Sequence, residues 1–152
     1  MKKQALVLGL GPFGMALVRS LTALGVDVLA VDKNPKLTRL AADIAAEAAS
    51  FDGADEEALA RAAPGRRDVC ICAIGDESRD SAIMCTALLR QMGARRVIAR
   101  AADPVLARIL KLVGAHEVVN PENAFGERLA VHIAHEGVMG EYPLSAGIII
   151  TE

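Results

Sequence analysis

The fold of this chain is decided near its amino terminus, where residues 6–16 read LVLGLGPFGMA. A short apolar run there breaks into the spacing G-x-G-x-x-G, and residues 12–24 then carry apolar side chains at helical spacing. Residues 5–8 are too few for a buried helix and are ended by glycine, so they are predicted to form a strand. The glycines therefore lie where a strand passes into a helix.

The three glycines of this motif have separate uses in a loop that binds phosphate. Gly9 allows a tight turn, Gly11 lets a pyrophosphate approach the backbone, and Gly14 lets the helix lie close to the strand. Free N–H groups and the positive end of the helix dipole favour an anion at such a helix start. The motif predicts a phosphate-binding loop, with a purely structural turn as the alternative.

An acidic residue, Asp32, follows the next apolar run and lies 18 residues beyond Gly14. A carboxylate at the end of the second strand can accept hydrogen bonds from both hydroxyls of an adenosine ribose. It would also repel the 2′-phosphate of NADP, although the adjacent Lys33 weakens that preference. Asp32 therefore favours NAD or another adenosine ligand.

The rest of the chain alternates short apolar runs with segments of helical periodicity. Further strands are predicted at residues 26–31, 47–51, 68–74, 96–101 and 116–119. Further helices are predicted at residues 36–46, 55–63, 77–92, 104–113 and 121–136. About six strands, each followed by a helix, predict an α/β fold with a Rossmann-like doubly wound parallel sheet and helices on both faces.

The domain organisation follows from the same pattern. We expect one Rossmann-like domain over residues 1–136, because the alternation ends there. Residues 137–152 are expected to be a linker and the start of a possible truncated C-terminal domain, with a strand candidate at 147–151.

Composition excludes several classes of protein. The 152 residues carry a formal net charge of −2, which gives no electrostatic reason to expect nucleic acid or an anionic membrane surface. No apolar segment approaches the roughly 18 residues that a membrane span needs, and no signal peptide is visible, so direct membrane insertion is not expected. Cys70, Cys72 and Cys85 lie in apolar surroundings without C-x-x-C spacing, which is typical of buried thiols in a reducing cytoplasm.

Other polar or small residues end the remaining predicted strands, at the sheet edge where nucleotides bind. Asp52, followed by Gly53, could reach an adenine amino group or could simply form a turn or helix cap. Gly75 permits a close approach, whereas Asp76 is expected to cap the next helix. Arg100 could contact a phosphate or pair with an acid.

Two negative observations bear on chemistry. His132 and His135 share a helix face with Glu136, but no further ligand cluster is evident, so a helix surface is favoured over a metal site. The predicted nucleotide fold also uses almost every residue and leaves no substrate domain for hydride transfer. Binding without catalysis is therefore favoured. The alternative is a small NAD-dependent oxidoreductase, or the cofactor-binding domain of one.

A set of short motifs over residues 4–136 resembles the regulator-of-potassium-conductance domain, abbreviated RCK or KTN, of Trk- and Ktr-type potassium uptake systems. The motifs are LVLGLGPFG (6–14), VLAVDKNP (28–35), FDGADEEAL (51–59), AIGD (73–76), IARA (98–101) and KLVGAHEVVNPE (111–122). The resemblance implies a non-enzymatic, cytoplasmic, nucleotide-binding subunit that forms homodimers, which in the family commonly assemble into octameric rings, and that gates a membrane potassium transporter or channel. Peripheral attachment to the membrane would come through that partner.

The resemblance also implies which residues contact the nucleotide. The expected set is Gly9, Leu10, Gly11, Pro12, Phe13, Gly14, Asp32, Lys33, Asp52, Gly53, Ala73, Ile74, Gly75 and Arg100. In some family members an acid equivalent to Glu122 helps hold a divalent cation near the phosphates at the dimer interface.

One position departs from the family pattern. The family commonly has arginine where this chain has Pro12, which offers neither a charge nor an N–H to a terminal phosphate. NAD(H), ADP or AMP is therefore favoured as the ligand, with ATP still possible.

Overall fold

The structure, a computed structural model, describes residues 2–136. The contacts between residues group the chain into two compact units, Met1–Val119 and Asn120–Glu152. The described part of the second unit is the helix α6 (Pro121–Ala134) and the residues that flank it. The expected domain boundary after residue 136 stays a prediction, and the strand expected at 147–151 lies outside the described residues.

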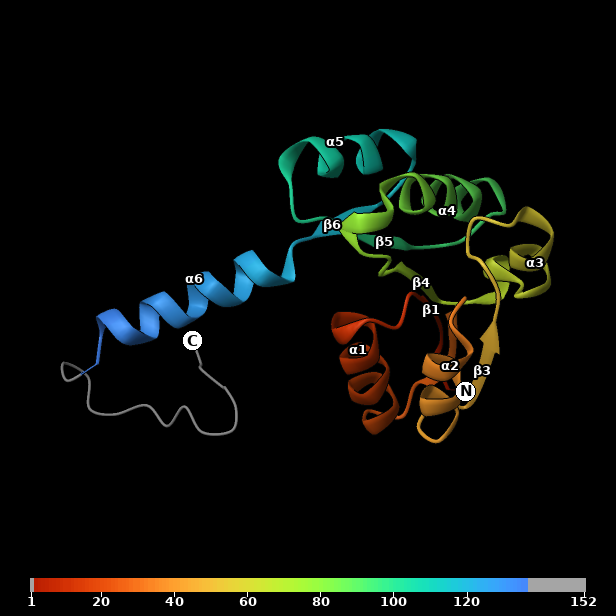
Figure 1. Cartoon of the computed structure of the whole chain (residues 1–152), viewed down its shortest axis with the longest axis horizontal. Coiled ribbons are helices and arrows are strands. Elements are labelled where there is room, and N and C mark those ends of the chain that lie inside the picture. Colours follow the sequence, from red (N-terminus) through yellow and green to blue (C-terminus); the bar gives the residue numbers. More distant parts are fainter. Residues whose placement is uncertain (1, 137–152) are drawn as a thin grey trace. The chain divides into compact units, whose positions relative to one another are not determined.

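The first unit is built on a six-stranded sheet in which every neighbouring pair is parallel (Figure 1). The strands are β1 (Gln4–Leu8), β2 (Asp27–Asp32), β3 (Glu47–Ser50), β4 (Val69–Cys72), β5 (Val97–Arg100) and β6 (Glu117–Val119). Their order is β3-β2-β1-β4-β5-β6. The order reverses between β1 and β4, so the ends of these two strands frame the crevice where such sheets bind ligands. The predicted Rossmann-like fold is confirmed.

Proline and short polar side chains set where the helices begin. The helices of this unit are α1 (Pro12–Ala23), α2 (Pro35–Ala42), α3 (Glu56–Arg61), α4 (Arg79–Gln91) and α5 (Pro104–Val113), with 3-10 turns η1 (Pro64–Arg66) and η2 (Asp76–Ser78). Pro12 occupies the first position of α1, as predicted, because its fixed φ suits a helix start. Asn34 caps α2 by accepting a hydrogen bond from the Lys36 N–H at 2.9 Å. None of the helices in residues 2–136 is long and apolar enough to cross a membrane.

The sheet separates two apolar layers. Leu6 and Leu8 of β1 point to the layer that contains α3, α4 and α5, whereas Ala5 and Val7 point to the layer that contains α1 and α2. Figure 1 shows α1 and α2 on the opposite side of the sheet from α4 and α5. β1 is apolar and buried on both faces because side chains alternate along a strand and helices cover both sides.

Several predicted helices and strands extend one to four residues beyond the observed ones. The helix predicted over 36–46 ends at Ala42, and the N–H of its C-cap residue Asp43 donates to the Leu40 carbonyl at 3.4 Å, three residues back rather than four. The strand predicted over 68–74 ends at Cys72, where the chain turns over Gly9. The helix predicted over 77–92 begins at Arg79, after the 3-10 turn η2.

Candidate functional site

The glycine loop between β1 and α1 is held against the end of β4. Gly9 has a φ of +102°, and a Cβ at this residue would lie 2.8 Å from backbone atoms of both Ala73 and Ile74. A Cβ at Gly14 would overlap the carbonyl oxygen of Gly9. These two positions require glycine because backbone packs on backbone, whether or not a ligand is bound.

Gly11 differs from the other two glycines. A Cβ at Gly11 would meet no atom within 4 Å, and its φ of −69° is open to any residue. Gly11 is the N-cap of α1 and has no side chain with which to cap the helix. The protein itself therefore does not require glycine here, and open space borders a helix start that favours an anion. Of the other loop residues, Leu10 is buried and Phe13 is half-buried.

Asp32, the last residue of β2, binds the glycine loop directly. One carboxylate oxygen accepts a hydrogen bond from the Leu10 N–H at 2.7 Å, and the other accepts one from the Asn34 N–H at 2.8 Å. A carboxylate has about four acceptor positions, so two remain for ribose hydroxyls. The sequence predicted only the ribose contact and missed the contact with Leu10, because nothing in the local pattern indicates it.

The end of β3 carries the next expected contact. Asp52 forms a turn in which its carboxylate accepts a hydrogen bond from the Ala54 N–H at 2.9 Å, while Asp55 is the cap of α3. The turn alternative for Asp52 is thus present, and a contact with adenine stays a prediction. Gly53 is buried, and a Cβ there would lie 3.3 Å from the Cys85 sulfur. Lys33 is exposed beside Asp32.

The residues after β4 line the other side of the glycine loop. The Ala73 N–H donates to the Leu8 carbonyl at 2.7 Å, which extends the parallel pairing beyond the strand. Ala73 is buried and Ile74 is half-buried. A Cβ at Gly75 would overlap the carboxylate oxygens of Glu77 and lie 2.8 Å from its carboxyl carbon. The sequence did not single out Glu77.

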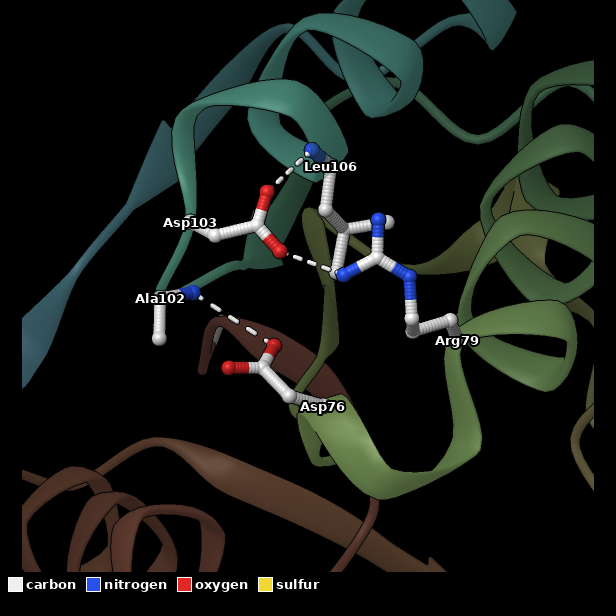
Figure 2. Close-up of polar contacts among 5 residues, drawn as sticks. All are labelled: Asp76, Arg79, Ala102, Asp103 and Leu106. Carbon is white, nitrogen blue, oxygen red and sulfur yellow. Dashed lines mark hydrogen bonds and ion pairs between the residues drawn. The ribbon is translucent and has the colours of Figure 1, made fainter.

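Polar contacts join the loop after β4 to the loop after β5 (Figure 2). Asp103, the N-cap of α5, accepts a hydrogen bond from the Leu106 N–H at 2.8 Å and pairs with Arg79 at the start of α4. The Leu106 N–H and the Arg79 guanidinium hold the pKa of Asp103 below its usual value. Asp76 accepts a hydrogen bond from the Ala102 N–H at 3.4 Å, so its predicted role as a helix cap is wrong.

The expected ligand contacts of Arg100 and Glu122, like those of the other site residues, stay predictions. Arg100 is the last residue of β5 and is half-buried, opposite Val119 of β6 in the strand register. Glu122 is exposed in the first turn of α6, in the second unit. Within residues 2–136, no group of three or more His, Cys, Asp or Glu side chains could hold a metal ion.

The cysteines are buried free thiols, as predicted from their apolar surroundings. Burial raises the pKa of Cys70 to about 12. The hydrogen bond with Cys72 and burial raise the pKa of Cys85. Such thiols behave as small apolar side chains and contribute to the layer beneath α4.

The family comparison agrees with this geometry. The TrkA-N domain matches residues 5–121 of the chain, from the first strand to the start of α6. The chain belongs to the TrkA-N domain family. The resemblance to potassium-conductance regulators seen in the sequence is thereby confirmed.

Relatives of this TrkA-N domain include named components of potassium uptake systems. Ktr system potassium uptake protein A of Vibrio alginolyticus is 33% identical over 150 residues, which cover 99% of this chain and 68% of that protein. Ktr system potassium uptake protein C of Bacillus subtilis is 32% identical over 145 residues, which cover 95% of this chain and 65% of that protein. The chain therefore spans about two thirds of the length of these relatives.

Solved structures share the fold of this TrkA-N domain. The NAD(P)-binding domain of an exopolyphosphatase-related protein from Archaeoglobus fulgidus has a TM-score of 0.77 at 25% identity, covering 89% of this chain and 100% of that one. The GsuK channel bound to NAD has a TM-score of 0.74 at 19% identity, and the match covers 87% of this chain and 24% of that one. GsuK bound to ADP has a TM-score of 0.74 at 20% identity, and the match covers 90% of this chain and 36% of that one.

Proposed function

We propose that this TrkA-N domain binds NAD(H) or an adenine nucleotide and uses its occupancy to gate a membrane potassium transporter or channel. The observation that carries the proposal is the open space at Gly11, together with the Asp32 carboxylate that contacts the same loop. Gly9 and Gly14 are required by the fold, whereas a Cβ at position 11 would meet no protein atom, so the space there is open to a ligand that approaches the backbone.

The proposed binding mode assigns each part of the nucleotide to a strand end. The adenosine ribose would donate to Asp32, whose carboxylate keeps two acceptor positions free of the Leu10 and Asn34 bonds. The diphosphate would lie at the start of α1, with Arg100 approaching it, and Asp52 would reach the adenine. A diphosphate-containing adenosine ligand is supported by the open space at Gly11, which borders the start of α1.

Gating would follow from differential affinity. A nucleotide that binds one arrangement of a homodimer more tightly than another shifts the population toward it, and a membrane partner that contacts the dimer can respond. We propose a cytoplasmic, non-enzymatic subunit that forms dimers and further rings, held at the membrane through that partner. The Ktr relatives support potassium as the ion, and GsuK with NAD or ADP supports the ligand class. Glu122 would contribute to a divalent-cation site between protomers.

A thermal-shift panel of NAD, NADH, ADP, AMP and ATP tests the proposal. A ligand that binds only the folded state at 100 times its Kd stabilises it by about 2.7 kcal/mol and raises the Tm. Gly11→Ala should abolish the shift and lower the ligand-free Tm only slightly, because its Cβ meets no protein atom although alanine is a poorer helix N-cap than glycine. Gly126→Ala is the matched control, since Gly126 also has open space around its Cβ position.

Two results would refute the proposal. One is the absence of any shift in the wild type with all five nucleotides, and the other is an undiminished shift in Gly11→Ala. Turnover of NADH with simple carbonyl substrates would instead support the oxidoreductase alternative.

A further inference from the structure

The loop after β4 carries a carboxylate that no proposed ligand contact uses. Glu77 is exposed in the 3-10 turn η2, yet its carboxylate lies against Gly75, in the space that a Cβ at Gly75 would take. The adjacent Asp76 places a second carboxylate in the same turn, bound by one oxygen to the Ala102 N–H (Figure 2). This turn therefore places two acidic side chains in succession at the sheet edge where the nucleotide is proposed to bind.

The strand order indicates which part of a nucleotide would meet Glu77. Asp32 ends β2 and is placed for the adenosine, while the glycine loop after β1 is placed for the diphosphate. A ligand that runs onward across the switch point reaches the end of β4. The glycine loop already touches Ala73 and Ile74, directly before Gly75. The group beyond the diphosphate therefore faces the turn that holds Glu77.

That group differs in charge between the candidate ligands. In ATP it is a third phosphate, which adds negative charge next to the Glu77 carboxylate. In NAD(H) it is a second ribose, whose hydroxyls are neutral donors to a carboxylate. Arg79 is paired with Asp103, and Pro12 offers no N–H, so neither is available in this conformation to offset a third phosphate. Arg100 is expected at the diphosphate, which ATP, ADP and NAD(H) share.

We propose that Glu77 is a specificity-determining residue that selects NAD(H) over ATP. Its carboxylate accepts hydrogen bonds from the second ribose and repels a third phosphate at the same position. This role rests on the proposed nucleotide site, and it names the dinucleotide as the ligand class that the site prefers.

Calorimetric titration of the full chain with NADH, ADP and ATP tests this role. In Glu77→Gln we expect ATP to bind about fivefold more tightly, since one like charge is removed near the third phosphate. NADH should bind about fivefold more weakly, since bonds to a charged acceptor become bonds to a neutral one. ADP should change less than about twofold. Glu47→Gln is the matched control, because Glu47 is exposed at the start of β3, which is separated from β4 by β2 and β1.

The ratio of the ATP and NADH dissociation constants decides the outcome, because any effect of the substitution on folding cancels within one variant. The role is supported if this ratio moves in Glu77→Gln and stays at the wild-type value in Glu47→Gln. It is overturned if the ratio is the same in both variants, or if wild type binds ATP more tightly than NADH. Failure of all three nucleotides to bind wild type would instead refute the nucleotide site itself.

Discussion

Replacing Asp32 with alanine tests whether this carboxylate holds the glycine loop as well as a ligand. In the ligand-free chain it binds the Leu10 N–H at 2.7 Å and the Asn34 N–H at 2.8 Å. The first of these bonds joins residues 22 apart in sequence and ties the loop after β1 to the end of β2. Asp32→Ala removes both hydrogen bonds and leaves the Leu10 and Asn34 N–H groups without this acceptor.

The expected loss of stability follows from these two contacts. A hydrogen bond to a charged group contributes about 1.5–3 kcal/mol, and the lower value applies to Asp32 because it is half-buried. The part-buried Leu10 bond contributes about 1.5 kcal/mol and the exposed Asn34 bond less, so the total is about 2 kcal/mol, or a fall in Tm of roughly 4 °C or more for a chain of this size. Asp32→Asn should lose less, because its amide oxygen can still accept one of the two bonds.

The same variants separate the two roles of Asp32. Thermal and urea unfolding without ligand report loop anchoring, and titration with NADH reports the ribose contact, which we expect to weaken by about 1–3 kcal/mol. Asp43→Ala is the control, because Asp43 is an exposed carboxylate that ends α2. Equal Tm values for Asp32→Ala and Asp43→Ala would refute the anchoring role. Unchanged NADH affinity in Asp32→Ala would remove it from the proposed site.

Two further predictions concern ionisable groups. The pKa of Asp103 is lowered in the folded state, so its contacts with Leu106 and Arg79 stabilise the protein above the unfolded pKa of about 3.9. The wild type should therefore have a higher free energy of unfolding in urea than Asp103→Asn at neutral pH, and this difference should shrink from about pH 5 to pH 2. A difference that persists in acid would contradict the prediction. All three cysteines are buried, and burial raises the pKa of Cys70 to about 12. A thiol reagent at pH 8 should therefore label the native protein far more slowly than the protein in urea, and rapid native labelling would count against burial.

Much of the fold was predictable because its signals are local. Proline at the first position of α1, α2 and α5, and apolar runs ended by glycine or a polar residue, mark each element within a few residues. The boundaries that failed lie where local signals are weak. Nothing in the sequence around Ala42 marks the end of α2. The apolar run at 68–74 continues past Cys72, which is the last residue of β4.

The candidate site was predictable in its positions but less so in its contacts. Glycines 9, 11 and 14 share one motif, yet only the fold separates Gly11, with open space around it, from the two glycines that touch backbone. Asp76 was expected to cap a helix, but it binds the Ala102 N–H on the next loop. Glu77 had no signal at all, because its position against Gly75 depends on the path of a 3-10 turn.

The sequence by itself determined the succession of strands and helices along the chain, the spacing of the phosphate-loop glycines and the acid at the end of the second strand. These features depend on periodicity, turn residues and caps within a few neighbouring residues. Only the tertiary structure decided that Asp32 also anchors Leu10, and that Arg79 pairs with Asp103. Both contacts join residues more than 20 positions apart. They arise because parallel strands in the order β3-β2-β1-β4-β5-β6 bring all their carboxyl ends to one edge of the sheet, where loops distant in sequence meet.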